Sequence, residues 1–559
     1  MKNHLKHFAF VASLLIAATS YANEYYDFEV DGIYYGINDD GTSVYVSYKD
    51  ENYNAYSGSV VIPATVVYNG TTFDVTAIGQ SAFYDCAELT DVSLPESITL
   101  IDEHAFTYCA KLASITIPEA VTKIGWGAFE SCTALTEIVI PDAVTHIGEF
   151  AFNKCTSLAS ITFGKSLCKI GYRAFKRTAW LENQPDGPVY TGKVFYMYKG
   201  TMPKNYSIAL DEGTLGIAGE AFDSETNLVG ISIPETVTTI EDSAFSGCSG
   251  LTSIELPGSL TDIGSYAFSE CAGLTSIVIP RGVTYVPAAC FLSCTNLASI
   301  TIHDDLTDVG NQAFDDTAWY NNHPDGVTYL DKVLYKYKGT APENFSHAVK
   351  EGTIAIADAA FDLQANLVAI SIPSTVKVLG FRSLSGTSLT SITLPNSITE
   401  IQGHTLSHCA NLASLSIGND VSFIGYAAFL DCTSLMSFTS HTPTPPTVST
   451  EEWTFQNIPA DCVLYVPEKS IEAYRTANGW SRFTNICAIP QGGISAIGSD
   501  SIKITSVAGA ISIVGAQGAV AEVYSAGGAL LYRGTESTIA MPRGLYIVKV
   551  AGRTAKVVI

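Results

Sequence analysis

Basic residues are scarce in this chain. Its 559 residues include 30 Lys and Arg against 55 Asp and Glu, which gives a formal net charge of −25. A surface this acidic repels nucleic acid and anionic lipid, so neither is an expected partner. Charged residues make up only 15% of the chain and hydrophobic residues 47%, a composition that excludes an intrinsically disordered protein.

Long apolar runs are lacking after the first residues, so no transmembrane segment is expected in the mature chain. At the start, Lys2 and Lys6 are followed by an apolar run, residues 8–18, that is too short to span a bilayer comfortably. Ser20-Tyr21-Ala22 places small residues at cleavage positions. Residues 1–22 are therefore predicted to be a signal peptide, which implies an extracellular or cell-surface location.

Catalytic and metal-binding signatures are also missing from the sequence. It contains no His-Glu-x-x-His, no Gly-x-Ser-x-Gly and no phosphate-binding loop. No Cys-x-x-Cys pair or Cys/His cluster offers metal ligands. A carboxylate pair for glycoside hydrolysis would need a cleft between facing elements. The sequence predicts no enzymatic activity, no metal and no other cofactor.

Phenylalanine, in contrast, recurs in a regular pattern, most often after Ala and at a step of 23 residues. The recurring residues are Phe83, Phe106, Phe129, Phe152, Phe175, Phe222, Phe245, Phe268, Phe291, Phe314, Phe361 and Phe429. Leu384 and Leu406 take the same place in the last block. The fullest copies add a strand pattern ending in Pro, as in residues 112–118, and an Ile-Gly pair, as in Ile124-Gly125. Such a period predicts a repeat solenoid in which rungs stack as a parallel β-sheet around a Phe-filled interior.

The Ile-Pro strand end, the Ile-Gly pair and the Ala-Phe-x-x-Cys turn resemble the BspA-like leucine-rich repeats of bacterial and protist surface proteins. The resemblance covers roughly residues 76–440. It implies a leucine-rich-repeat solenoid with a parallel β-sheet and short helical turns. It also implies a cell-surface adhesin or interaction protein, since some relatives bind host matrix proteins or other bacteria.

Two units of the array are longer than the rest. Phe175 and Phe222 lie 47 residues apart, one more than two repeats, and so do Phe314 and Phe361. The two units match at an offset of 139, which pairs Trp180 with Trp319. We expect β-hairpin inserts at about residues 176–212 and 315–351, each containing a Pro-Asp-Gly turn.

The inserts also hold the aromatic residues that a binding surface would use. The outward strand positions of the rungs are mostly Ser and Thr, whereas protein-binding faces are rich in Tyr, Trp and Arg. The candidate binding residues are Trp180, Tyr190, Tyr196, Tyr198, Trp319, Tyr320, Tyr329, Tyr335 and Tyr337. The alternative for half of them is that they pack the hairpins onto the rungs.

Nine of the 13 cysteines lie three residues after the Phe or Leu position. They are Cys86, Cys109, Cys132, Cys155, Cys248, Cys271, Cys294, Cys409 and Cys432. Adjacent rungs would hold these side chains parallel, a poor geometry for a disulfide, and the middle block has an odd number of them. We therefore expect buried, unreactive thiols. A disulfide between Cys462 and Cys487 is left open.

The ends of the chain depart from the repeat. Residues 23–74 read as an N-terminal β cap, residues 75–440 as the solenoid and residues 441–490 as a C-terminal cap. Residues 491–559 have short Val- and Ile-rich strands and Gly-rich turns, as in a small β-sandwich. Gly527-Gly528, residues 542–546 and the final Lys-Val-Val-Ile resemble the C-terminal sorting domains of the type IX secretion system in Bacteroidota. A plain accessory β-domain is the alternative.

Two classes of function fit this sequence. The first is an adhesin that binds host or bacterial surface proteins. The second is a glycan-binding surface protein for nutrient capture or cell-wall attachment. A contiguous patch across rungs would favour a protein ligand, and a linear row of aromatics on the inserts would favour a glycan.

Overall fold

The computed structural model describes residues 25–303, 305–449 and 451–489, and beyond them the segments 503–507, 510–514, 520–525, 530–536, 538–541, 544–550 and 553–558. The chain divides into two compact units, Met1–Ile489 and Pro490–Ile559. The predicted signal peptide, the Gly527-Gly528 turn and Pro542 lie outside the described residues.

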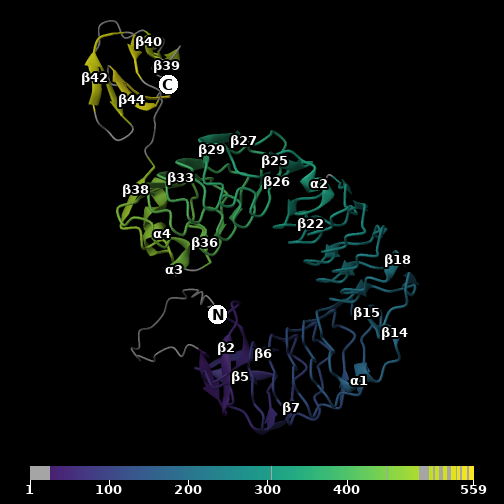
Figure 1. Ribbon diagram of the computed structural model, residues 1–559. Coiled ribbons are helices and arrows are strands. Elements are labelled where there is room, and N and C mark those ends of the chain that lie inside the picture. Colours follow the sequence, from purple (N-terminus) through teal and green to yellow (C-terminus); the bar gives the residue numbers. More distant parts are fainter. Residues whose placement is uncertain are drawn as a thin grey trace. The chain divides into compact units, whose positions relative to one another are not determined.

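The first unit is a solenoid whose rungs form two hydrogen-bonded ladders (Figure 1). The corner ladder precedes the Ile-Gly pairs and is built from β8 (Leu100–Ile101), β9 (Lys123–Ile124), β11 (His146–Ile147), β13 (Lys169–Ile170), β17 (Gly216–Ile217), β19 (Thr239–Ile240), β20 (Asp262–Ile263), β22 (Tyr285–Val286), β24 (Asp308–Val309), β28 (Ala355–Ile356), β30 (Val378–Leu379), β32 (Glu400–Ile401), β34 (Phe423–Ile424) and β36 (Thr447–Val448).

The face ladder follows the Leu of each repeat. Its strands are β4 (Gly58–Val61), β7 (Leu89–Ser93), β10 (Glu137–Val139), β12 (Ser160–Thr162), β16 (Tyr206–Ala209), β18 (Leu228–Ser232), β21 (Ser276–Val278), β23 (Ser299–Thr301), β27 (Phe345–Ala348), β29 (Leu367–Ser371), β31 (Ser391–Thr393), β33 (Ser414–Ile417) and β35 (Ser437–Ser440). Pairing is parallel and in step with the repeat, so that Ile138 faces Ile161. Residues 112–117 and 251–256 are not regular strands, and Thr136 N lies 3.4 Å from Ala113 O.

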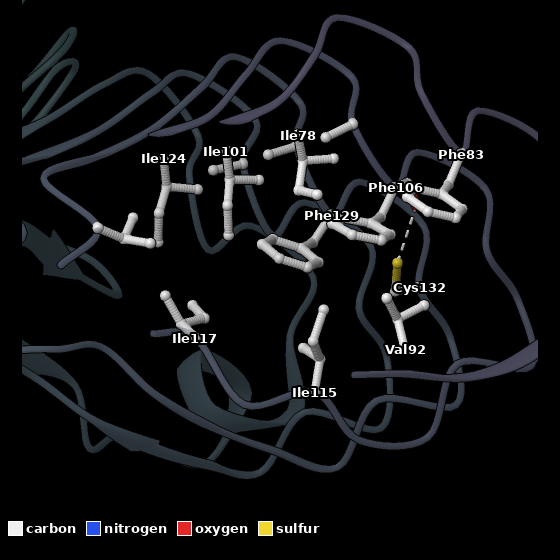
Figure 2. Packing of buried hydrophobic residues seen from close by; sticks show 14 of the residues in the cluster. Ile78, Phe83, Val92, Ile101, Phe106, Ile115, Ile117, Ile124, Phe129 and Cys132 are labelled. Carbon is white, nitrogen blue, oxygen red and sulfur yellow. Dashed lines mark hydrogen bonds between the residues drawn. The ribbon is translucent and has the colours of Figure 1, made fainter. Parts of the chain in front are cut away.

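The ladder Phe residues fill the interior between these walls, as the repeat predicts. Their rings are fully buried and nearly parallel, with centroids 4.9 Å apart for Phe83 and Phe106 and 5.4 Å apart for Phe291 and Phe314. Figure 2 shows the stack of Phe83, Phe106 and Phe129 beside the Ile ladder. Leu384 and Leu406 are equally buried in the place of Phe. Burial of one such side chain is worth about 1.5–3 kcal/mol.

The turn that carries each Phe is held to the next rung by backbone hydrogen bonds. Phe106 N donates to Ala128 O at 2.7 Å, and Tyr108 N donates to Glu130 O at 2.8 Å. These bonds replace the i→i−4 bonds of a helix, so the segment is a series of tight turns closed by contacts such as Cys109 N to Phe106 O at 3.2 Å. Tight turns of this kind thus stand where the sequence predicts short helical turns.

The Ile-Gly pair marks a place where adjacent rungs approach closely. A Cβ on Gly125 would lie 2.5 Å from the backbone of Asp102, and one on Gly148 would lie 2.6 Å from Gly125. Only glycine allows this spacing, since real Cβ contacts are longer.

The inserts are rungs in their own right. Each contains a short helix and an antiparallel hairpin, as the sequence predicts: α1 (Ala179–Glu182), β14 (Gly187–Thr191) and β15 (Val194–Lys199), then α2 (Ala318–Asn321), β25 (Gly326–Leu330) and β26 (Val333–Lys338). Strand β15 pairs with β17 and so continues the corner ladder. Phe195 consequently stacks on Phe222 at 4.6 Å.

Before the first rung the chain forms an antiparallel meander that joins the corner ladder. It consists of β1 (Phe28–Val30), β2 (Ile33–Ile37) and β3 (Ser43–Ser47), and β3 pairs with β6 (Thr71–Ile78), which also pairs with β5 (Thr65–Tyr68). After the last rung come α3 (Glu451–Thr454), β37 (Val463–Val466), η1 (Glu468–Ser470), α4 (Ile471–Thr476) and β38 (Asn485–Ala488). Trp480 is fully buried there, and its Nε1 donates to Pro446 O at 2.8 Å.

The second unit contains two antiparallel sheets. One joins β39 (Lys503–Val507), β40 (Ala510–Val514) and β43 (Thr538–Ala540). The other joins β41 (Ala521–Ser525), β42 (Leu530–Gly534), β44 (Leu545–Val550) and β45 (Arg553–Val558). Ile511 and Ile513 of the first sheet share one buried cluster with Val523 and Val548 of the second.

All 13 cysteines are free, Cys462 and Cys487 included, so the open question of a disulfide between these two is answered against it. The nine ladder cysteines are buried. Burial raises the pKa of the Cys86 thiol to about 11 and that of Cys248 to about 12. Desolvated thiols of this kind are unreactive.

Candidate interaction surface

The insert aromatics were the sequence's candidate binding surface, and for three of them that prediction is wrong. Tyr196, Tyr335 and Tyr337 are 4%, 1% and 7% exposed. They are buried because β15 and β26 are part of the stacked wall, where the consecutive residues 194–196 and 333–335 are all covered by the neighbouring rungs. The hydroxyl of Tyr196 accepts a hydrogen bond from Phe175 N at 3.0 Å, a structural role.

The other six insert aromatics are half-buried and contact either a ladder Phe or other residues of their own insert. Trp180 packs edge-on against Phe175 with centroids 5.5 Å apart, and Tyr190 against Phe195 at 5.3 Å. Trp319 packs against Phe314 in the same way as Trp180 against Phe175. The partners of Tyr198, Tyr320 and Tyr329 lie within the inserts. The structure therefore does not bring these side chains together into one open row.

The outward side of the face ladder is exposed and hydroxyl-rich. Ser and Thr occupy most of its positions, and Val139 and Val278 are 58% and 54% exposed. Small side chains of this kind lack the bulk of interface anchors.

A different surface gathers aromatic rings on the turn side of the rungs. We call it the turn-side row and define it as Tyr84, His104, Tyr108, Trp126, Phe150 and Tyr172. Successive rings are in contact edge-to-face from one rung to the next. Centroids are 5.5 Å apart for Tyr84 and Tyr108, 4.1 Å for His104 and Trp126, 5.8 Å for Trp126 and Phe150, and 4.9 Å for Phe150 and Tyr172.

The row is partly open to solvent. Tyr108 and Trp126 are 40% and 38% exposed, and the remaining rings are half-buried. The indole N–H of Trp126 donates to Glu149 Oε2 at 3.2 Å, which fixes the ring. Burial lowers the pKa of His104 below its usual value, so this ring is neutral at pH 7.

Three of the six row residues, His104, Tyr108 and Phe150, have a left-handed backbone. In each rung the residue two before the ladder Phe and the residue two after it have positive φ, as in His104 (57°), Tyr108 (65°) and Phe150 (55°). This conformation costs a non-glycine residue roughly 1–2 kcal/mol. It persists because the same residues donate rung-to-rung hydrogen bonds, for example His104 N to Trp126 O at 2.7 Å.

At its end the row meets a basic hollow of about 290 Å³. Its lining is formed by Trp126, Glu130, Phe150, Asn153, Lys154, Arg173, Lys176 and Arg177. Lys154 Nζ lies 3.0 Å from Glu130 Oε1. The Arg173 guanidinium lies 4.2 Å from the Tyr172 ring centroid, and its Nε is 3.5 Å from Glu220 Oε2. The hollow therefore combines apolar rings with cations.

Sequence reasoning missed both the row and the hollow, although signals were present. Residues 150–181 contain six Lys and Arg and no Asp or Glu, in a chain with an acidic excess of 25. The row residues all lie within three positions of a ladder Phe. A second, shorter row occupies the same places in later rungs: Phe381, His404, Tyr426 and Trp453.

Other kinds of site find little support in the part of the chain that the structure describes. No group of three or more His, Cys, Asp or Glu residues is arranged to hold a metal ion there. No helix among the described residues is long and apolar enough to cross a membrane.

Comparison with known proteins agrees with this repeat architecture. The family model described as the BspA type leucine-rich repeat region matches in six copies over residues 75–184, 215–339 and 347–462. No curated protein matches the chain.

Several solved structures resemble the chain. A leucine-rich repeat protein from Bacteroides ovatus is 22% identical, with 83% of this chain and 100% of that one covered and a TM-score of 0.24. A leucine-rich cell surface protein from Faecalibacterium prausnitzii is 22% identical over 74% and 94% of the two chains, with a TM-score of 0.23. A leucine-rich repeat protein from Bacteroides capillosus is 32% identical over 24% and 96%, with a TM-score of 0.21.

Proposed function

The chain belongs to the BspA type leucine-rich repeat family, and from that premise we propose that it is a secreted or cell-surface adhesin. Its ligand in this proposal is a protein of the host matrix or of a bacterial surface. The role is non-enzymatic: the solenoid holds an interaction surface in place.

The turn-side row is the observation that carries this proposal. It is a contiguous patch across five rungs and contains Tyr, Trp and His, with Arg173 at its end. Tyr, Trp and Arg are the residues that most often dominate protein–protein binding energy. Rungs locked by hydrogen bonds also present the patch in a fixed form, which lowers the entropy lost on binding.

A glycan ligand has less support. A linear row of open ring faces on the inserts would favour it, but Tyr196 and Tyr335 are buried and Trp180 and Tyr190 pack against the rungs. The Ser- and Thr-rich face ladder supplies hydroxyls without stacking platforms.

A panel experiment tests the choice between these ligands. Purified residues 23–559 are screened against immobilised matrix proteins, bacterial surface proteins and a glycan array. Saturable binding to a protein, which persists after enzymatic deglycosylation of that protein, supports the adhesin. Binding to glycans alone refutes it.

Export is a separate part of the proposal. We infer that residues 1–22 direct the chain across the inner membrane and that the second unit acts as a sorting tag for surface display. The second unit has its own hydrophobic cluster, separate from the clusters of the solenoid, so removing it leaves the solenoid's packing intact.

Deleting residues 493–559 tests the sorting role. Cell fractionation should then find a folded solenoid retained in the periplasm, with the circular dichroism spectrum expected of the first unit. If the truncated protein still reaches the surface, or if it unfolds, the second unit is structural and is not a sorting tag.

A further inference from the structure

The basic hollow stands out against the charge of the whole protein. Four of its lining residues are cations, Lys154, Arg173, Lys176 and Arg177, in a chain with a net charge of −25. The acidic residues of the other rungs repel anions. A local cluster of cations therefore restricts an acidic partner to this one place on the surface.

Two of the four cations are already engaged. Lys154 pairs with Glu130 at 3.0 Å, and Arg173 lies between the Tyr172 ring and Glu220. Lys176 and Arg177 are exposed, and neither pairs with a carboxylate among the described residues. These two side chains are therefore free to bind a ligand.

The wall beside the free cations is aromatic. Trp126 and Phe150 line the hollow and pack edge-to-face with centroids 5.8 Å apart. The backbone at Phe150 (55°), Arg173 (53°) and Arg177 (61°) has the positive φ that each rung has two residues before and two residues after its ladder residue.

We propose that the basic hollow is the docking site for an acidic segment of the protein partner, an inference that rests on the proposed adhesin function. Carboxylates of the segment pair with Lys176 and Arg177, and a neighbouring apolar side chain covers Trp126 and Phe150. Arg177 can hold a carboxylate through two parallel hydrogen bonds, which gives direction as well as attraction.

The carboxylates around the hollow favour a peptide over a polyanionic glycan. Glu130 lines the hollow, Glu149 is bonded to Trp126 and Glu220 is beside Arg173. A polymer with an anion on every unit would meet these three groups. A peptide can place a neutral or basic residue opposite them and an acidic residue opposite Lys176 and Arg177.

The test uses a short labelled peptide of alternating Glu and Leu, its Lys-and-Leu counterpart and heparin, each titrated into the mature chain. The acidic peptide should bind, more weakly as salt is raised, and the basic peptide should not. Lys176→Glu/Arg177→Glu should weaken binding about tenfold or more. Lys193→Glu/Lys204→Glu makes the same charge change at exposed lysines outside the hollow and should bind as the wild type does.

A single variant keeps the test valid if charge reversal disturbs folding. Arg177→Gly removes a free cation and relieves a positive φ, so it should fold normally and bind the peptide less tightly. Equal affinity in Arg177→Gly and the wild type, or binding of heparin without the acidic peptide, overturns the proposal. If the double reversal leaves capture of a matrix protein unchanged, this inference fails while the adhesin proposal stands.

Discussion

The thiol of Cys132 donates a hydrogen bond to the backbone carbonyl of Phe106, one rung earlier, with a sulfur–oxygen distance of 3.1 Å (Figure 2). The contact recurs between Cys109 and Phe83 at 3.0 Å and between Cys294 and Phe268 at 2.9 Å. The same carbonyl also accepts a backbone N–H in its own rung, such as Cys109 N to Phe106 O. The cysteine ladder thus completes the hydrogen bonding of a row of buried carbonyls.

Thiol labelling of the native protein should modify only Cys168 and Cys487, because the other 11 of the 13 cysteines are buried. Burial raises the pKa of the Cys86 thiol to about 11, which suppresses the reactive thiolate. The measurement is mass spectrometry after alkylation. Denaturation without reductant should expose all 13 to label, and a shortfall would reveal disulfides that contradict the ladder.

Replacing Phe129 by Ala should destabilise the solenoid by about 3–5 kcal/mol, since the ring is fully buried between Phe106 and Phe152. Phe129→Leu is the matched control, because the chain itself places Leu384 and Leu406 in this position. Phe129→Leu should lower the free energy of unfolding clearly less than Phe129→Ala does. Denaturant unfolding measures both, and equal stability of wild type and Phe129→Ala would show that the Phe stack does not support the fold.

Thr178 takes the cysteine place at the start of the first insert, and we expect Thr178→Cys to cost about 1 kcal/mol. Its Oγ1 donates to Phe175 O at 2.8 Å and accepts Leu181 N at 3.2 Å as the N-cap of α1. A thiol replaces the first bond but is a weak acceptor for the second. Hydrogen exchange of residues 179–183 should speed up in Thr178→Cys and stay unchanged in Thr178→Ser.

Glu241 gives the solenoid a pH dependence of known sign. Burial raises the pKa of this carboxyl from 4.5 to about 7, with the nearby Lys169 acting in the opposite direction. The protonated carboxyl is the form that the folded state favours. Its contribution to the free energy of unfolding is complete below pH 4.5 and is lost as the pH rises through 7. Glu241→Gln should therefore raise the free energy of unfolding by about 1–3 kcal/mol at pH 8 and change it little at pH 4.5. The same gain at both pH values would assign the effect to packing.

Much of the fold follows from the 23-residue period. The places of the Phe residues, the Ile-Gly pairs and the two hairpins are set by features that repeat, and the interior accepts only a narrow range of side chains there. The burial of Tyr196 and Tyr335 could not be predicted from the repeat. Whether a hairpin strand joins the stacked wall depends on its pairing with the next rung, which the sequence does not state.

The turn-side row and the basic hollow could not be found from the sequence because they use positions that differ from rung to rung. His104, Phe150 and Arg173 occupy equivalent places two residues before the ladder Phe, where other rungs have residues as different as Ser81, Gly127, Glu220 and Ala289. A consensus sequence of the repeats treats these positions as ones where any residue is tolerated, so it gives no sign of a shared role. Here the varying positions share a left-handed backbone that directs their side chains to one side of the stack. The negative net charge of the whole chain gives no sign of the Lys and Arg residues gathered there.

The binding affinity of Trp126→Ala for the protein ligand found in the panel tests the adhesin function most directly. Trp126 is 38% exposed in the middle of the turn-side row, and Tyr426, 41% exposed, has the same place in a later rung and provides the matched control. We expect the Kd of Trp126→Ala to rise about tenfold or more, with an unfolding transition close to that of the wild type. Tyr426→Ala should bind normally. An unchanged Kd for Trp126→Ala would contradict the assignment of this surface as the ligand-binding site.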